Sequence, residues 1–452
     1  MDDTNDNKPS DNVPLTSTSA SPSSNTDNLG LIADQTATIA VVHASVGSGH
    51  KVAAEAIAEA LEHIVEACKE RFAPVSTKIN VEVLDILSFG RIVFDGDKAA
   101  SMFTGPTRPI YDITWRYVLT GRLLWGGGTI WSHLMFSDFT QWVREKNPAA
   151  VICTHITAAN VAVGARMITR QEFPIVSVPT DYDIEGLWPH KYTDLFCVGT
   201  ESMAETLRAR NIEEERIIIT GIPARSDFRT GYDRDEVRRE WNIPQDKKLA
   251  LVLAGASLPR PYVRFRETLA KALPYFKDLE HIHLIIIAGK DSDYASGLRR
   301  HLEREGVQNV TVLGYTNQIA KLMAASDFAI CKPGGLTVTE CLCTQTPMIL
   351  VGKAYGQEKV NVRMLTSLGA ALHVQTAREL VTAMKFVSRI GSSLEAMLAN
   401  AEQLSRPDAA VQIAMSSLQL AIAPTTGGDR ERRLSKRPFL SFYWGQQPAH
   451  TR

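Results

Sequence analysis

Short apolar runs alternate along this chain with longer segments of helical periodicity, and the runs form two series. A short run that is apolar throughout is typical of a strand buried on both faces, as in a parallel sheet. The first series lies at 39–44, 81–86, 150–154, 175–178, 195–198 and 217–220, and the second at 249–254, 282–288, 310–313, 328–331 and 348–351. A polar, charged stretch separates the series. We therefore expect an α/β chain with two doubly wound, Rossmann-like domains that face each other across a cleft.

The two ends of the chain differ in composition from the part between them. Ser, Thr, Asn, Asp and Pro dominate the first thirty residues, which cannot bury enough apolar surface to offset the entropy lost on ordering. The expected organisation is a disordered tail over 1–36, a first domain over 37–225, a second over 226–423, and a basic, aromatic tail over 424–452.

Bulk composition excludes several classes of protein. The chain has 49 basic and 50 acidic side chains, and its net charge of −1 argues against a nucleic-acid-binding protein, which needs a basic excess. The six cysteines lack CxxC spacing, which favours reduced thiols in a cytosolic protein over disulfides or a zinc site. Because no signal peptide and no apolar run of about 18–20 residues is visible, we expect a soluble or peripheral protein.

A glycine-containing turn follows the first apolar run. Gly47 and Gly49 allow the backbone to approach a ligand, and His50 comes directly after them. The spacing fits neither a Walker A loop nor a complete GxGxxG motif, and a tight turn in a generic α/β domain explains the glycines equally well. His50 favours a functional site, because α/β domains place their chemistry at the carboxyl ends of strands.

A second turn of this kind, after the run at 328–331, is the stronger signal. Gly334, Gly335 and Thr337 stand where a helix is expected to begin, and the unpaired N–H groups and dipole of a helix N-terminus favour a pyrophosphate. Glu340 offers a carboxylate to ribose hydroxyls.

The next turn along the chain is polar as well. It carries Gln357, Glu358 and Asn361, a carboxylate and two amides that suit the hydroxyls of a sugar. A purely structural explanation would require a Gly-Gly cap and a polar loop to coincide at successive strand ends.

Five motifs occur in the order in which one enzyme family carries them. They are VVHASVGSGH at 41–50, TDY at 180–182, GIP at 221–223, KPGG at 332–335 and GQEKVN at 356–361. Together they resemble the monogalactosyldiacylglycerol synthase and processive diacylglycerol glucosyltransferase family, which is related to the peptidoglycan N-acetylglucosaminyltransferase. The resemblance covers about residues 38–420 and implies inverting transfer from a UDP-sugar by a two-domain GT-B enzyme.

The resemblance also implies a role for each matching residue. The first domain would take the lipid acceptor beside Gly49 and His50. The second domain would bind the UDP-sugar, with the diphosphate at Gly255, Ser257, Gly334, Gly335, Leu336 and Thr337, the uracil at Gly314, Tyr315 and Ile319, the ribose at Glu340, and the sugar at Gln357, Glu358 and Asn361.

Two places depart from the family pattern. Glu185 stands where the family often has a histidine, three residues before Trp188, and this bears on the acceptor site and the base. Pro259, Arg260 and Pro261 follow Gly255 in place of a glycine-rich loop, and this bears on the diphosphate contacts there.

Aromatic residues concentrate in the segment 108–143, which holds four of the seven tryptophans. Tyr111, Trp115 and Trp125 belong to it, with basic residues between them, and Trp188 is expected on the same acceptor side. Trp and Tyr favour the headgroup level of a bilayer, and basic residues add attraction to anionic lipids. Aromatic packing between helices explains the segment equally well when it is taken alone. The tail at 429–444 repeats the basic and aromatic pattern, which fits either weak lipid anchoring or simple disorder.

The expected function is inverting transfer of a hexose from UDP-glucose or UDP-galactose to a lipid hydroxyl, with diacylglycerol as the acceptor, on the inner face of the cell membrane. His50 is the first candidate for the base on that hydroxyl, with Asp181 and His155 as alternatives. The helix that opens at Gly334 and Gly335 would stabilise the departing UDP, so neither a metal ion nor a further cofactor is expected.

Three other readings remain open from the sequence. Within the same class, the chain could be an N-acetylglucosaminyltransferase that acts on a polyprenyl-linked acceptor. The same two-domain fold also carries UDP-sugar epimerases, against which the aromatic segment speaks. A membrane-associated UDP-sugar sensor without catalytic activity is compatible with every donor motif and with Glu185.

Overall fold

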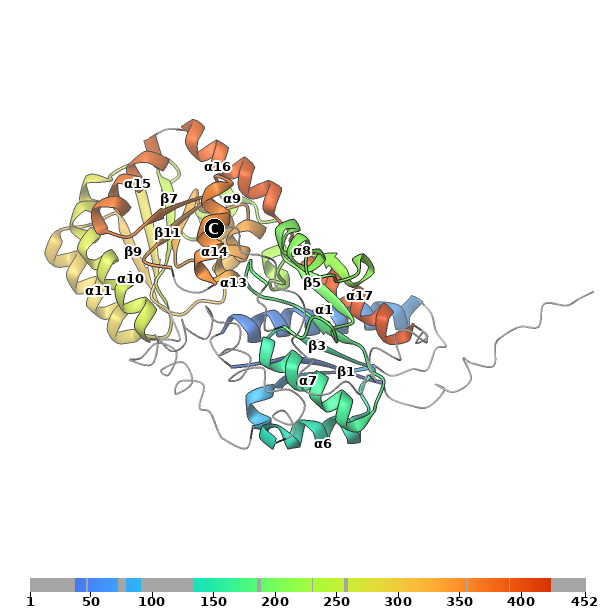
Figure 1. Cartoon of the computed structure of the whole chain (residues 1–452). Coiled ribbons are helices and arrows are strands. Elements are labelled where there is room, and N and C mark those ends of the chain that lie inside the picture. Colours follow the sequence, from blue (N-terminus) through green and yellow to red (C-terminus); the bar gives the residue numbers. More distant parts are fainter. Residues whose placement is uncertain are drawn as a thin grey trace, which may run out of the picture.

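The computed structural model describes residues 37–45, 48–71, 79–90, 134–184, 188–229, 231–255, 259–354, 357–389 and 391–423. Within these residues lie two six-stranded parallel sheets, each covered by helices on both faces (Figure 1). Two doubly wound α/β layers were expected from the sequence, and this prediction is confirmed. The two predicted tails lie outside the described residues.

The first sheet has the strand order β2-β1-β3-β4-β5-β6. The order reverses between β1 and β3, and the carboxyl ends of two strands diverge at such a switch point and leave room for a ligand. Its strands are β1 (Ala37–His43), β2 (Ile79–Asp85), β3 (Ala150–Cys153), β4 (Ile175–Ser177), β5 (Leu195–Val198) and β6 (Ile217–Ile219).

Alternate residues of the first sheet face different helices, as the pleat of a strand requires. Ala40 and Val42 of β1 lie in a core cluster with α6 (Ser137–Lys146) and α7 (Ile156–Thr169). Their neighbours Ile39 and Val41 lie in a second cluster that includes α1 (Gly49–Arg71) and α17 (Ala409–Ile422). Both faces of this sheet are therefore covered.

The second sheet has the order β9-β8-β7-β10-β11-β12, which is the 3-2-1-4-5-6 order of dinucleotide-binding domains, with a switch point between β7 and β10. The last strand is absent from the sequence-based prediction, because His373 interrupts a short edge strand that is only half-buried. The strands are β7 (Lys248–Leu253), β8 (Ile282–Ile287), β9 (Val310–Leu313), β10 (Phe328–Cys331), β11 (Met348–Val351) and β12 (Ala371–Val374).

Helices also cover both faces of the second sheet, with α10, α11 and α15 on one face and α12, α13 and α14 on the other. These helices are α10 (Pro259–Ala272), α11 (Ser292–Glu305), α15 (Ala377–Arg389), α12 (Ile319–Ala324), α13 (Gly335–Cys343) and α14 (Glu358–Ser367). The remaining helices are α8 (Glu201–Arg208), α9 (Arg234–Glu240) and α16 (Gly391–Leu404), with 3-10 turns at Ile86–Phe89, Glu214–Arg216, Ser226–Arg229 and Leu273–Asp278.

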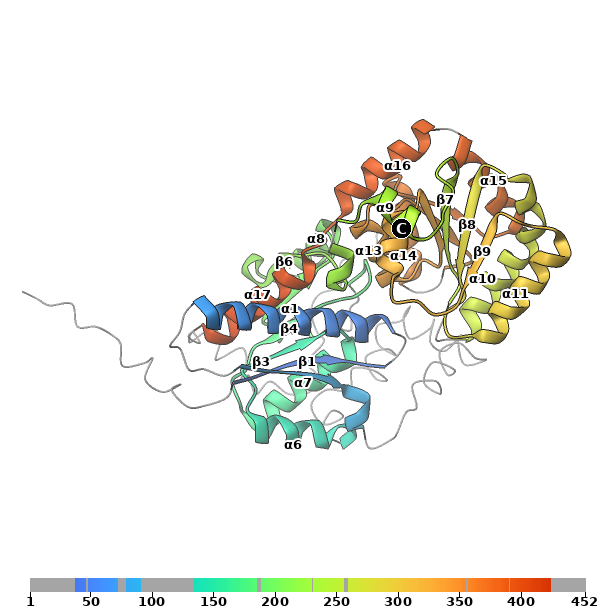
Figure 2. The ribbon, with the colours of Figure 1, turned by 180° about the vertical axis from the view of Figure 1, so that it is seen from behind.

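The last described helix returns to the first sheet. Although α17 falls within the range expected for the second domain, it runs beside α1 in both views (Figures 1 and 2), and its Ile413 and Ala414 are buried in the first-sheet core. The two chain crossings between the sheets meet at Gly221, which has φ +90° and whose missing Cβ would collide with the Arg406 side chain. Glycine is therefore required where the crossings touch.

Several aromatic residues expected near a membrane are core residues instead. Phe139 is fully buried where α6 packs on α7, Phe136 is buried beside it, and Trp142 stacks on Phe139 with ring centroids 5.6 Å apart. Trp188 is only 4% exposed and packs in the same core, so its expected place on the acceptor surface is wrong. Tyr111, Trp115 and Trp125 lie outside the described residues. Among the helices that the structure describes, none has the length and apolarity to cross a bilayer.

A buried ion pair joins α7 to the connection before β5. Arg166 Nη1 and Asp194 Oδ2 are 2.5 Å apart, and both side chains are fully buried. The guanidinium also donates to the carbonyl oxygens of Phe173 and Tyr192, and the Asp194 carboxylate accepts from the Ile175 amide. Each charged group is therefore paired with its counter-ion and hydrogen-bonded to the backbone. Loss of one member would leave the other charge buried without its counter-ion.

The substitution Arg166→Met should lower the free energy of unfolding of the first domain by about 3–5 kcal/mol, because the Asp194 carboxylate then stays buried without its cation. Urea unfolding followed by circular dichroism measures this loss. A matched control is Arg208→Met, which removes exposed ion pairs with Glu201 and Glu214 and should cost far less. Equal losses in the free energy of unfolding for the two variants would show that the buried pair contributes no more to stability than the exposed ones.

Candidate functional site

The two switch points face each other across the interface between the sheets. Helix α1 begins at Gly49 after β1, and helix α13 begins at Gly335 after β10. A Cβ placed on Gly49 would lie 3.8 Å from the Cβ of Leu336, so the N-termini of the two helices meet. The predicted acceptor-side and donor-side turns are thus brought together by the fold.

His50, in the first turn of α1, is held from two sides. Its Nδ1 lies 3.0 Å from the Thr154 carbonyl oxygen and 2.8 Å from the Thr180 hydroxyl, and the Thr154 hydroxyl donates to the His50 carbonyl oxygen. A carbonyl oxygen only accepts hydrogen bonds, so Nδ1 carries the proton and Nε2 of the neutral ring keeps its lone pair. Burial lowers the pKa of His50 to about 4, so this base-competent form prevails at neutral pH.

His155 lies edge-on against His50, with ring centroids 4.6 Å apart and an interplanar angle of 85°. Its Nδ1 accepts from the Thr157 amide and caps helix α7. The lone pair of the neutral ring is therefore already used, and the other nitrogen carries the proton. Burial and the neighbouring His50 lower the pKa of His155. This geometry argues against His155 as the base. The His155 ring instead packs against the His50 ring and shields it from solvent.

Asp181 lies beside the first turns of α13 and α14. Its Oδ1 accepts a hydrogen bond of 3.1 Å from Asn361 Nδ2, and it would lie 2.6 Å from a Cβ placed on Gly335. Burial raises the pKa of Asp181 to about 6, and the nearby Glu358 contributes in the same direction. The carboxyl group therefore titrates close to neutral pH, unlike an exposed aspartate.

The start of α13 is built as the sequence predicts. Gly334 is the N-cap in extended conformation, and the first intrahelical bond of the helix runs from the Val338 amide to the Gly334 carbonyl oxygen. The amides of Gly335, Leu336 and Thr337 consequently have no partner within the helix, as in any first turn. Such a terminus attracts anions through its N–H groups and its dipole.

A cation lies next to this helix start. Lys332, directly after β10, forms an ion pair of 2.7 Å with Glu358, and each side chain is about one-fifth exposed (23% and 21%). Sequence reasoning identified Glu358 and Gln357 at the start of α14 but missed Lys332, although a lysine immediately before a Pro-Gly-Gly helix start was the available signal. The pair places one positive and one negative group at the expected junction of diphosphate and sugar.

Glu340 lies in the second turn of α13, close to the connection between the domains. Burial raises the pKa of its carboxyl group to about 8, and the neighbouring Arg225 partly offsets this effect. The carboxyl group is therefore neutral at neutral pH, and a ligand that requires a carboxylate has to displace its proton.

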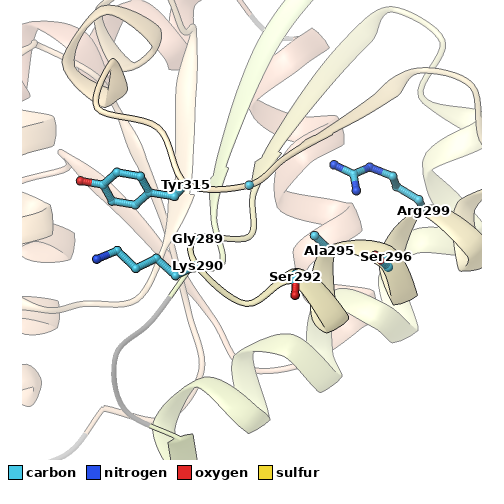
Figure 3. A pocket seen from close by; sticks show the side chains of 8 residues that line it. Gly289, Lys290, Ser292, Ala295, Ser296, Arg299 and Tyr315 are labelled. Carbon is cyan, nitrogen blue, oxygen red and sulfur yellow. The ribbon is translucent and has the colours of Figure 1, made fainter.

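A pocket of about 410 Å³ opens at the carboxyl ends of β8 and β9, beside the first turns of α11 (Figure 3). Tyr315 is 67% exposed, and Lys290 extends alongside it with Nζ 5.1 Å from the ring centroid. Gly314 also lines the pocket, whereas Ile319 packs on the core across the sheet. Gly255 approaches so closely that a Cβ there would lie 2.9 Å from Gly289 Cα. Ser257 and Glu185 lie outside the described residues.

Two family models match consecutive parts of the chain. Residues 50–224 match the monogalactosyldiacylglycerol (MGDG) synthase model, and residues 255–419 match the glycosyltransferase family 28 C-terminal domain. Each match contains one of the two sheets almost completely.

Curated relatives agree with the first of these models. The processive diacylglycerol beta-glucosyltransferase of Bacillus licheniformis is 29% identical over 264 residues, which are 58% of this chain and 67% of the relative. The enzyme of the same name from Bacillus subtilis is 28% identical over 240 residues, which are 53% of this chain and 61% of the relative. The matched part thus spans about three-fifths to two-thirds of these relatives.

Solved structures share the fold at low sequence identity. MurG of Acinetobacter baumannii has a TM-score of 0.54 with 16% identity and covers 85% of this chain and 99% of its own. The UDP-GlcNAc 2-epimerase of Neisseria meningitidis, solved with UDP-GlcNAc, has a TM-score of 0.54 with 14% identity and covers 84% and 100%. The two parallel sheets and the two domain models identify a GT-B glycosyltransferase, and the chain is similar to the monogalactosyldiacylglycerol synthase and processive diacylglycerol glucosyltransferase family.

Proposed function

We propose that the protein transfers a hexose from a UDP-sugar, UDP-glucose or UDP-galactose, to the hydroxyl of diacylglycerol with inversion at the anomeric carbon. The observation that carries this proposal is the position of His50, a neutral imidazole with a free Nε2, beside the N-terminus of α13. A base and an anion seat at one interface are what displacement of a nucleoside diphosphate requires. The names of the relatives favour diacylglycerol over a polyprenyl-linked acceptor.

In the proposed reaction, His50 Nε2 takes the proton of the acceptor hydroxyl. At the same time, the oxygen of that hydroxyl attacks the anomeric carbon. The bond between that carbon and the diphosphate oxygen breaks, and UDP leaves with the electron pair. A single displacement inverts the configuration. The proton on Nδ1 stays on the ring and is hydrogen-bonded to the Thr154 carbonyl oxygen, which stabilises the imidazolium that forms.

The departing UDP needs compensation of its negative charge. The first-turn amides of α13 and the Lys332 ammonium group supply it in this proposal, since preorganised dipoles and charges act strongly in a site with little water. The mechanism requires no metal ion. Asp181 stays the alternative base, although its Oδ1 is already engaged by Asn361.

The rest of the donor is assigned by position. We assign the sugar hydroxyls to Gln357 and Glu358, the ribose to Glu340, and the uracil to the pocket beside Gly314 and Tyr315. The acceptor reaches the site from a membrane surface that contains anionic lipids, and the aromatic segment before residue 134 and the C-terminal tail provide the contact in this proposal.

The proposed function predicts labelled glycolipid when the purified chain is incubated with radiolabelled UDP-glucose or UDP-galactose and diacylglycerol in vesicles with anionic lipids. The chain should also float with these vesicles. Polyprenyl-linked acceptor serves as the comparison substrate. Product from that acceptor alone would refute the diacylglycerol assignment, and absence of product with every acceptor and donor would refute transfer itself.

The substitution His50→Ala should lower kcat by about 10²–10⁴, because the acceptor hydroxyl loses its base. UDP affinity should stay within about twofold, since His50 belongs to the acceptor side. Isothermal titration with UDP and single-turnover transfer measure the two quantities. His63→Ala, an exposed histidine on the same helix, is the matched control and should leave both unchanged. Lost UDP binding in a folded His50 variant would contradict the assignment.

If the Glu340 carboxylate accepts hydrogen bonds from the ribose, UDP binding has to release the proton that its raised pKa of about 8 retains. Affinity should therefore rise with pH, by about fivefold between pH 7 and pH 8 and by about twofold more at higher pH. Titration calorimetry in buffers of different ionisation enthalpy should show the released proton. The Glu340→Gln variant should lose both effects. A pH-dependent affinity that persists in this variant would place the titrating group elsewhere.

A further inference from the structure

The segment 180–182 follows strand β4 of the first sheet but also contacts the second domain. The Tyr182 ring is only 7% exposed and lies in the second-domain core with Val338 and Leu342 of α13. Its hydroxyl lies 2.9 Å from the Thr339 hydroxyl. Because Thr339 donates its own proton to the Gly335 carbonyl oxygen, Tyr182 is the donor in this contact.

Asn361 holds the same segment from helix α14. Its side chain is completely buried, and its Oδ1 accepts from the Tyr182 amide at 3.1 Å. Its Nδ2 donates to Asp181 Oδ1 at 3.1 Å and to the Pro333 carbonyl oxygen at 3.0 Å. Both protons of the amide nitrogen are thus directed at protein groups. A sugar hydroxyl would find no free donor on this fully buried side chain, which argues against the expected role of Asn361 as a sugar ligand.

The backbone of the segment 180–182 packs directly against Gly335, which has no side chain. A Cβ at this position would collide with the Thr180 carbonyl oxygen and would lie 3.2 Å from the Asp181 Cα. The absence of a side chain at Gly335 therefore serves the approach of the two domains, in addition to exposing the amides of α13.

The other end of the segment reaches the base. The Thr180 hydroxyl lies 2.8 Å from His50 Nδ1, next to the Thr154 carbonyl oxygen that accepts the same proton. A continuous chain of contacts consequently leads from Asn361 through Asp181 and Thr180 to His50.

We propose that Asn361 is a positioning residue that fixes the segment 180–182 on the second domain and thereby sets the orientation of His50. The inference rests on the proposed function in one respect, the role of His50 as the base. The physical reason is geometric. A base displaced by about 1 Å costs about 10²-fold in rate, and the segment is the direct link between the donor-binding helices and the imidazole.

The test compares Asn361→Ala with Gln357→Ala, its neighbour among the assigned sugar ligands. Asn361→Ala should expose the Tyr182 amide to hydrogen exchange, lower kcat about 10²-fold, and leave the ratio of UDP-sugar affinity to UDP affinity unchanged. Gln357→Ala should reduce that ratio and leave the exchange of the amide unchanged. A reduced ratio in the Asn361 variant would restore it as a sugar ligand and overturn the proposal.

The pH profile supplies a readout that a merely structural defect does not move. Around His50 lie Thr154, Thr180, His155 and the buried His43. When the segment detaches, water reaches the imidazole, so the acidic limb of kcat/KM should move from about 4 towards the ordinary histidine value of about 6.5. An unchanged limb in Asn361→Ala with lowered kcat would contradict action through His50.

Two further variants separate the proposal from its assumptions. Thr180→Val removes only the hydroxyl beside His50 and should lower kcat while the Tyr182 amide stays protected. If Asn361→Ala does not fold, Tyr182→Phe, which removes the bond to Thr339, should show the same shifted limb in a folded protein. Hydrogen exchange needs no turnover, so an inactive wild type would refute the proposed function while the anchoring by Asn361 would still be decided by exchange at Tyr182.

Discussion

The hydrogen bond from His50 Nδ1 to the Thr154 carbonyl oxygen determines how the rest of the site works. It fixes the tautomer, leaves Nε2 as the acceptor, and joins the start of α1 to the end of β3 at the switch point of the first sheet. His155 closes the site from the side, with its own lone pair committed to the α7 cap. In the proposed function, Nε2 of His50 is therefore the imidazole nitrogen open to the acceptor proton, because Nδ1 of each ring already has a partner.

Burial suppresses charge on both sides of the interface. The pKa values of His50 and His155 are lowered and those of Asp181 and Glu340 are raised, in each case mainly by desolvation. Lys332 and Glu358 compensate each other directly. At neutral pH both histidines and Glu340 are therefore uncharged, whereas Asp181, with a pKa of about 6, is mostly ionised. In the proposed function, the helix amides and Lys332 attract the diphosphate, while Asp181 and the ion-paired Glu358 are the charged carboxylates nearby.

The sequence predicted the two sheets, the turns after β1 and β10, and the residues at both switch points, because these depend on local apolar runs and glycines. It could not predict Trp188 or Asn361, since both roles depend on distant partners. From the sequence, Trp188 at the end of its motif was predicted to contact the acceptor, but in the fold it packs among core residues. Asn361, in a polar turn, was predicted to bind the sugar, but its side-chain amide is hydrogen-bonded to the segment 180–182, which lies far away in the sequence.

Because α17 returns to the first sheet, the core of the first domain depends on a helix that follows the second domain in the chain. The face of β1 and α1 that α17 covers is apolar, so a protein cut after the first crossing would leave that face in water. The first domain is complete only when the chain has passed through the whole second domain and come back. The core of the first domain therefore includes α17, the last helix that the structure describes, and truncation of the chain before α17 would destabilise the first domain more than the second.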